Sequence, residues 1–281
     1  MSYRALSIGT VCSIMCQQFD DEKGGNAMSG EIEVSHAGPV TIIKLNRAQV
    51  RNAINKATAQ ALYEAWMEFE ADEQARVGIL TGGNEVFCAG ADLRDLQGLG
   101  EGVQGERGPL GFTRLFVSKP TIAAVAGYCV AGGIEVACWC DLRIVDETAI
   151  FGCFERRFGV PLIDGGTQRL PRIVGLGRAL ELILTGRPVP AQEALTMGLA
   201  NEVVPRGQSL QRAIELGQQL ASFPQVTMRN DRQSVYNGLG RELAAGLRME
   251  AELGIETLRS GEAQAGSQVF QAGKGRKGDF S

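Results

Sequence analysis

Two short segments, FCAGADL at 87–93 and VAGYCVAGGIEVACWCDL at 125–142, constrain the fold more than any other part of the chain. Each reads as a buried strand, then small residues, then the start of a helix. Small residues let a ligand approach the backbone, and a helix N-terminus presents free N–H groups at its positive dipole end. The two turns can therefore hold a developing oxyanion between two amides, or they are tight turns in which glycine only permits packing.

The second segment places one carboxylate, Glu135, in a mostly apolar run three residues after Gly132. One helical turn carries its side chain back towards the amides at the turn. An ionised carboxylate in apolar surroundings is costly unless it is paired, hydrogen-bonded or protonated, so its position indicates a chemical role. The alternative is a first-turn glutamate that the helix dipole stabilises.

Strand and helix patterns alternate over the first two thirds of the chain, which predicts an α/β core. Residues 31–47 read as a hairpin with its turn at Ala37-Gly38-Pro39. Almost every residue from Pro224 to about Phe270 is expected to be helical. The other expected elements are helices at 54–72, 134–140, 176–186 and 191–198 and strands at 77–83, 121–127, 142–145 and 149–152.

Composition excludes several functions. The net charge is −4 and the pI is about 5.3, so the chain lacks the basic surface of a nucleic-acid-binding protein. Glycines and charges interrupt every apolar run before it reaches the length of a membrane span. Seven cysteines without C-x-x-C spacing predict reduced thiols that fill small apolar spaces, and hence a cytoplasmic protein. The single histidine, His36, is expected at the surface, and it cannot complete a mixed zinc site.

Three regions are expected along the chain: a disordered leader over 1–29, a core over 30–222 and a helical region over 223–281. The leader lacks regular patterning and a signal-peptidase pattern, and an upstream start codon chosen in error would also explain it. A formal G-x-G-x-x-G lies in the Gly-rich loop at 98–108, which we expect to be mobile. No strand precedes this motif and Pro109 follows it, so we exclude dinucleotide binding there.

Several motifs together resemble the enoyl-CoA hydratase/isomerase (crotonase) superfamily, in its order and spacing from about residue 31 onward. They are FCAGADL, AGGIE with its trailing CDLRI, GGTQRLPRIVG, LNRAQVRNAIN and TGRPVPAQEALTMGLANEVVP. The resemblance implies a crotonase-like spiral of ββα units with a C-terminal helical trimerisation region, and therefore a homotrimer or a dimer of trimers. It also implies an acyl-CoA thioester substrate, with CoA carried by the substrate and no separate cofactor.

By the same resemblance, the thioester carbonyl lies between the peptide N–H groups of Ala91 and Gly132, which stabilise an enolate. Glu135 chiefly activates water and Glu155 supplies the proton to Cα, or the two share both steps. The resemblance therefore favours an enoyl-CoA hydratase, which would convert trans-2-enoyl-CoA and water to 3-hydroxyacyl-CoA. For Glu155, the alternative is a surface glutamate paired with Arg156 or Arg157.

Asp164 departs from the family pattern, since hydratases commonly carry a small residue before GGTQRL. We expect it to cap the following helix, because Asp is strongly favoured at that position. If it points into the acyl pocket instead, it supplies a third acid and favours a Δ3-Δ2 or dienoyl-CoA isomerase. A catalytically silent acyl-CoA-binding subunit is a further alternative, although the presence of both glutamates opposes it.

The resemblance also implies residues that bind the substrate. Arg51 and Arg94 are candidates for the CoA phosphates, because arginine makes charge-assisted contacts to phosphate, or they are ordinary solvated arginines. Late residues such as Phe270 and Lys274 are weak candidates to cover the site of a neighbouring subunit. The complete predicted set is Arg51, Ala53, Ala89, Asp92, Leu93, Arg94 and Asp164.

Overall fold

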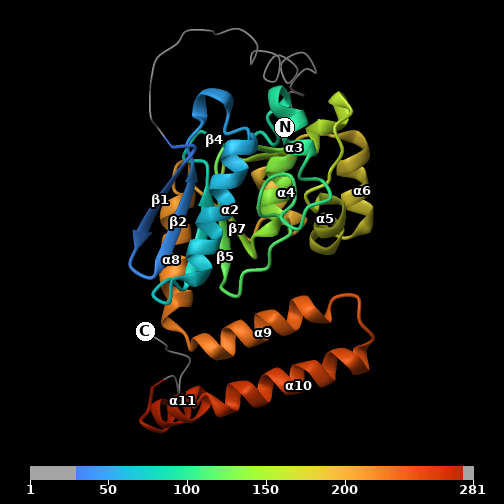
Figure 1. The fold of residues 1–281 in the computed structure, drawn as a ribbon. Coiled ribbons are helices and arrows are strands. Elements are labelled where there is room, and N and C mark those ends of the chain that lie inside the picture. Colours follow the sequence, from blue (N-terminus) through green and yellow to red (C-terminus); the bar gives the residue numbers. More distant parts are fainter. Residues whose placement is uncertain (1–29, 275–281) are drawn as a thin grey trace.

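The computed structural model describes residues 30–274, in which strands and helices alternate around two sheets (Figure 1). The predicted leader at 1–29 and the last residues, 275–281, lie outside the described residues. The larger sheet contains, in spatial order, β1 (Ile32–Ala37), β2 (Val40–Leu45), β3 (Val77–Thr81), β5 (Thr121–Val125), β7 (Leu142–Asp146) and β10 (Glu202–Val204). The smaller sheet contains β4 (Val86–Cys88), β6 (Tyr128–Val130), β8 (Ile150–Gly152) and β9 (Val189–Pro190).

The chain alternates between the two sheets as it advances. Strands β3, β5 and β7 pair in parallel in the larger sheet, and the strand that follows each of them, β4, β6 or β8, pairs in parallel in the smaller one. This stepwise stacking is the predicted spiral. The β1–β2 hairpin precedes it and turns at Gly38, whose φ of 63° favours glycine, so the predicted hairpin is confirmed.

The helices cover the sheets and continue beyond them. They are α2 (Lys56–Ala71), α3 (Leu96–Gly100), α4 (Gly132–Trp139), α5 (Gly166–Val174), α6 (Leu176–Thr185), α7 (Ala191–Thr196), α8 (Ser209–Ser222), α9 (Gln225–Gly238), α10 (Leu243–Arg259) and α11 (Glu262–Gln271). The helix predicted past Pro224 is confirmed as three helices, which form a layer beneath the core in Figure 1. The short helix α3 was not predicted, because it starts the Gly-rich stretch that was interpreted as a loop.

Two apolar layers lie on opposite faces of the larger sheet, as the two-residue period of a strand requires. One face, which includes Ile43, Leu80 and Val125, packs with α2 and α4. The other face includes Ile42 and Ile79 and packs on α8. Helix α8 approaches closely because Gly217 lies over Val40, where an added Cβ would be 3.1 Å from a Val40 methyl group.

An aromatic cluster joins α2, α4 and the segment after the Gly-rich loop. The ring centroids of Trp66 and Trp139 are 4.7 Å apart, and those of Phe112 and Trp139 are 4.8 Å apart at nearly a right angle. Edge-to-face pairs of this kind contribute about 0.5–1.5 kcal/mol of stability in addition to the contribution from the apolar area that they bury. The cluster therefore fixes residue 112, next to the candidate site, against the core.

Several smaller predictions concern the cysteines, the histidine and membrane spans. The five described cysteines are buried and free, as expected, whereas Cys12 and Cys16 lie outside the described residues. His36 is exposed, as expected. Of the helices between residues 30 and 274, none combines the length and the apolar character that a bilayer span requires. Helix α8 ends at Ser222 and α9 starts at Gln225, and the predicted domain division between them stays a prediction.

Candidate active site

A cavity of about 380 Å³ lies where the two Gly-rich turns meet α3 and the start of α5. One end is polar and is lined by Ala91, Gly132, Glu135, Glu155 and Asp164. The remaining wall is largely apolar and includes Leu96, Leu99, Val103, Leu110, Phe158 and Ile163. A largely apolar cavity with a few polar groups is typical of a site for a small, mostly apolar molecule.

The two predicted amides lie side by side at the polar end. A Cβ added to Gly90 would be 2.5 Å from the Gly132 nitrogen, and one added to Gly132 would be 3.4 Å from the Ala91 nitrogen. The backbone of Ile54 bonds Gly90 and Asp92, on either side of Ala91, which leaves the Ala91 N–H out of that pairing. Within residues 30–274, neither the Ala91 nor the Gly132 N–H donates to a protein acceptor.

Ala131 orients the second amide through an uncommon backbone conformation. It is the N-cap of α4 and has φ 52° and ψ −128°, although it is not glycine. Its own N–H donates to the Gly152 carbonyl at 2.9 Å, which holds this geometry. A non-glycine residue in this conformation lowers the stability of the fold by about 1–3 kcal/mol, and such strained residues are found most often at functional sites. As a result, the peptide that carries the Gly132 N–H is turned out of the strand direction.

Glu135 is buried, and its hydrogen bonds come from the turn before α5 and from the first residue of α5, not from its own helix. Its Oε1 accepts from the Asp164 N–H at 2.9 Å and from the Gly166 N–H at 2.8 Å. Position 166 must be small, because a Cβ there would lie 2.9 Å from the same oxygen. Burial, followed by the nearby Asp164 charge, raises the pKa of Glu135 to about 8. A role limited to the dipole of α4 does not explain these contacts.

Glu155 faces the cavity without a partner. It is only 4% exposed, and neither carboxyl oxygen has a hydrogen-bond partner among the described residues. Arg156 and Arg157 donate instead to the carbonyls of Ile183 and Gly186, so the alternative of a surface ion pair is wrong. Burial raises the pKa of Glu155 to about 7. A buried carboxyl group without a partner in a cavity indicates function more than stability.

The predicted capping role of Asp164 is wrong. Helix α5 begins at Gly166 after Gly165, whose φ of 103° only glycine adopts readily, and no side chain caps it. This turn directs the Asp164 side chain away from the helix. Its Oδ1 accepts instead from the Leu110 N–H at 3.0 Å and from the Thr113 hydroxyl at 2.5 Å. Asp164 also lines the cavity, where it is the third acid that the alternative interpretation allowed.

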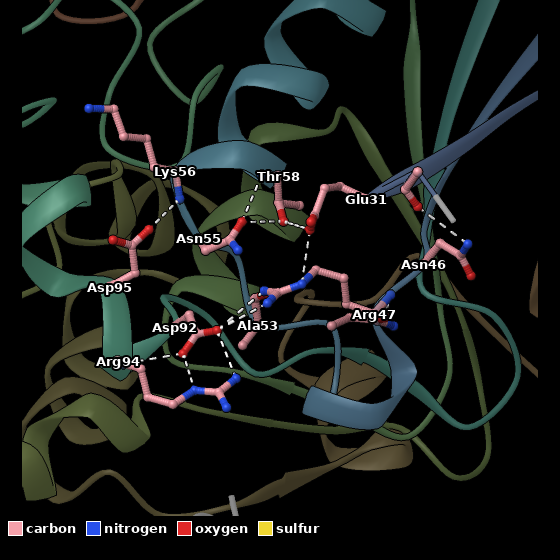
Figure 2. A network of polar contacts seen from close by, with 12 residues as sticks. Glu31, Asn46, Arg47, Ala53, Asn55, Lys56, Thr58, Asp92, Arg94 and Asp95 are labelled. Carbon is pink, nitrogen blue, oxygen red and sulfur yellow. Dashed lines mark hydrogen bonds and ion pairs between the residues drawn. The ribbon is translucent and has the colours of Figure 1, made fainter. Parts of the chain in front are cut away.

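Of the other predicted binding residues, Ala89 and Leu93 line the cavity, whereas Arg51, Ala53, Asp92 and Arg94 do not. Arg94 donates to Asp92, with Nε 3.1 Å from Oδ1 (Figure 2). One guanidinium nitrogen of Arg51, Nη1, is buried and has no partner within the described chain. Roles for these residues in binding CoA remain predictions.

Arg47 is a residue whose structural role the sequence did not reveal. Its guanidinium contacts Asp92 at 3.3 Å and Glu31 at 2.9 Å, and it also donates to the Ala53 carbonyl (Figure 2). It therefore ties the hairpin to the turn that carries Ala91. The only signal was its place in LNRAQVRNAIN, where Arg51 attracted the prediction.

Asn52 was also missed. It is fully buried and has φ 54°, a conformation that asparagine tolerates better than most residues. Its amide nitrogen donates to the carbonyls of Gly82, Val86 and Phe87, which fixes β4 just before the first turn.

Among residues 30–274, no group of three or more His, Cys, Asp or Glu side chains is arranged to hold a metal ion.

Comparisons with known proteins place this chain among relatives with similar sequences and a similar fold. The family profile described as Enoyl-CoA hydratase/isomerase matches residues 35–278. A short-chain-enoyl-CoA hydratase of Clostridium acetobutylicum is 36% identical over 221 residues, which covers 76% of this chain and 84% of that protein. The human mitochondrial protein named enoyl-CoA hydratase domain-containing protein 2 is 34% identical over 261 residues, 88% of this chain and 89% of its own.

A solved structure also matches. The crystal structure of an enoyl-CoA hydratase from Mycobacterium marinum superimposes with a TM-score of 0.82 and 32% identity. The match covers 87% of this chain and 96% of that one. The similarity therefore extends through both sheets and into the C-terminal helices.

Proposed function

This chain belongs to the enoyl-CoA hydratase/isomerase family, and on that basis we propose that it adds water to a trans-2-enoyl-CoA to give the 3-hydroxyacyl-CoA. One observation carries the proposal: Glu135 and Glu155 line the same cavity as two backbone N–H groups that donate to no acceptor within residues 30–274. Water addition needs a base, an acid and a site for the charge that develops on the thioester oxygen. The cavity contains a candidate for each of them.

The charge on the thioester oxygen is assigned to the two amides. The thioester carbonyl would lie between the N–H groups of Ala91 and Gly132. As water adds at Cβ, the thioester becomes an enolate and negative charge develops on its oxygen. Donors that are already in place stabilise this oxyanion without reorganisation, and each is worth about 10²–10³ in rate. The strained Ala131 backbone and the closely approaching Gly90 support this assignment.

The two carboxyl groups divide the proton transfers. Two N–H donors stabilise the ionised form of Glu135, which takes a proton from water. No donor in the described part of the chain bonds the Glu155 carboxyl group, and Glu155 gives a proton to Cα. Burial raises the pKa of Glu135 to about 8 and that of Glu155 to about 7, so at pH 7 the free pair carries at least one proton, mainly on Glu135. The proposed division of roles requires this proton to pass to Glu155 before water adds.

An isomerase is the second candidate, and Asp164 is the observation that favours it. Moving a double bond within the acyl chain requires proton removal and return without water, and a third carboxyl group in the cavity could take part. A silent acyl-CoA-binding subunit is less well supported, since it would not need two buried carboxyl groups beside the amides.

Incubation with crotonyl-CoA and longer trans-2-enoyl-CoAs tests the proposal. We expect the absorbance of the conjugated thioester to fall and the product to gain the mass of one water molecule. A 3-enoyl-CoA is the matched substrate for the alternative, because an isomerase would raise that absorbance instead. Activity on the 3-enoyl-CoA together with no hydration of any 2-enoyl-CoA would overturn the hydratase assignment.

The C-terminal helices support an assembly of three chains or of two such trimers. Large apolar side chains on α9 and α10 are exposed in the single chain, among them Leu243 at 78% and Leu258 at 68%. Burying each would contribute about 1.5–3 kcal/mol. Light scattering should give three or six times the chain mass of 30.0 kDa. A monomer at micromolar concentration would contradict this assembly.

Two further parts of the proposal concern chemistry and location. Adding water changes no oxidation state overall, so the proposed reaction uses no redox cofactor, and CoA arrives as part of the substrate. The buried free thiols fit a reducing compartment, and we assign the chain to the cytoplasm. Cell fractionation would test this location, since the human relative is named as mitochondrial.

A further inference from the structure

Asp164 contacts both the base of the proposed reaction and the wall of the acyl cavity. Its backbone N–H donates to Glu135 Oε1 at 2.9 Å. Its side-chain Oδ1 accepts from the Leu110 N–H at 3.0 Å and from the Thr113 hydroxyl at 2.5 Å. Leu110 lines the cavity as well, so a single residue bridges the wall and Glu135.

Two arginines strengthen this bridge. Arg169 donates to the Asp164 carbonyl at 2.9 Å and also to the Thr113 carbonyl. Arg114 donates to the Ile163 carbonyl at 3.3 Å. The segment 108–114 is therefore joined to the segment 163–169 through backbone and side-chain contacts at several points.

The space around the bridge is filled. A Cβ added to Gly108, whose φ is 80°, would lie 2.3 Å from the Thr113 hydroxyl and 3.0 Å from Asp164 Oδ1. On the other side, Phe112 is fully buried against Trp139. The segment thus has little freedom to move without changing its contacts with Asp164.

Leu110 extends the connection to the oxyanion site. It is 1% exposed, and its Cδ1 would be 2.8 Å from a Cβ added to Gly132. An acyl chain that presses on Leu110 would therefore act on the segment held by Asp164. Any shift of Asp164 changes one of the two hydrogen bonds that orient Glu135.

We propose that Asp164 is a positioning residue that couples the acyl wall at Leu110 and Thr113 to the orientation of Glu135, and is not a third catalytic acid. This inference rests on the proposed hydratase function. Its consequence is that the fit of the acyl chain changes kcat, and not only KM. The charged groups around the Asp164 carboxylate are Glu135, Arg114 and Arg169, with Glu155 across the cavity.

Asp164→Ala, Asp164→Asn, Thr113→Val and Thr113→Ser form the test set. Asp164→Ala removes the acceptor of the bridge and Thr113→Val removes its hydroxyl donor, so each should lower kcat about tenfold or more, with a smaller change in KM. Asp164→Asn keeps a carbonyl acceptor, so its kcat should be much closer to wild type than that of Asp164→Ala. Thr113→Ser keeps the hydroxyl, so its kcat should likewise be much closer to wild type than that of Thr113→Val. A catalytic acid predicts the reverse: Asn as damaging as Ala, and Thr113→Val like wild type. That result would overturn the proposal.

Two measurements separate the bridge from general loss of structure. Asp164→Asn removes a negative charge beside Glu135, so the limb of the pH–kcat profile that belongs to Glu135 should move to lower pH. In Thr113→Val the Asp164 charge is unchanged, so this limb should remain at its wild-type pH. An unmoved limb in Asp164→Asn would count against the contact with Glu135.

Hydrogen exchange tests the coupling without any turnover. In Thr113→Val we expect faster exchange at the Asp164 and Gly166 amides, which donate to Glu135, and wild-type exchange in Thr113→Ser. If wild type hydrates no enoyl-CoA, the proposed function fails while this measurement still decides the coupling. Unchanged exchange at both amides would overturn the coupling, whatever the activity.

Discussion

Glu135→Gln and Glu155→Gln should each lower the rate of enoyl-CoA hydration at least about 10²-fold, the lower end of what a positioned acid or base supplies. Glutamine has nearly the same shape and can still accept the two N–H bonds that Glu135 receives, but it cannot transfer the proton. The measurement is kcat with crotonyl-CoA. Acyl-CoA binding should change little, because neither carboxyl group holds the carrier. Near wild-type turnover in either variant would remove that residue from the mechanism.

The control for these variants is stability as a function of pH. The folded protein holds a proton on Glu135 up to a pKa of about 8, whereas the unfolded chain releases it near 4.5. The contribution of Glu135 protonation to the free energy of unfolding is therefore fully present below about pH 4.5, and it is lost as the pH rises through about 8. Glutamine does not titrate, so Glu135→Gln should be more stable than wild type at about pH 9, by on the order of 5 kcal/mol. Urea unfolding at both ends of this range measures the difference. Reduced stability of the variant at high pH would contradict the burial argument.

Gly90→Ala should lower turnover by about 10²–10³-fold, because it disturbs the amide pair directly. The new Cβ would lie 2.5 Å from the Gly132 nitrogen, so one of the two N–H groups must move or be covered. Removing a single oxyanion donor has an effect of this size in other enzymes. The variant should also lose about 1–2 kcal/mol of stability, because Gly90 has φ 92°. Steady-state kinetics and thermal unfolding measure the two effects.

Gly83→Ala is the matched control for Gly90→Ala. Gly83 has nearly the same φ, 88°, but an added Cβ there would meet only the Lys44 side chain, at 3.8 Å. This variant should therefore lose only the stability that the backbone conformation accounts for, and it should keep wild-type kcat. Equal losses of turnover in the two variants would mean that backbone strain, and not the amide pair, explains the effect.

The features that the sequence predicted correctly depend on local spacing. Glu135 lies one helical turn after Gly132, so its approach to the site follows from helix geometry once α4 is expected. The hairpin turn at Gly38 follows from glycine chemistry, and α2 follows from the spacing of Leu62 and Trp66. In each case the cause lies within a few residues of its effect.

The errors concern contacts between distant segments. Asp164 was expected to cap α5 because that rule is local, but its partners are more than 50 residues earlier in the chain. The burial of Glu155 and the turn of its arginine neighbours towards Ile183 and Gly186 depend equally on the packed fold.

The alternation of strands between two sheets has a consequence for how the chain acquires activity. The first amide follows β4 and the second follows β6, so they come from successive turns of the spiral, which pair along β4–β6 and β3–β5. Each turn contacts mainly its neighbours, as in a solenoid, and such chains fold by adding units to an existing stack. Neither turn alone contains both donors. A partly folded intermediate with only one of the two turns in place is therefore catalytically inactive. The rate at which activity recovers during refolding then reports the rate at which the second turn docks onto the first.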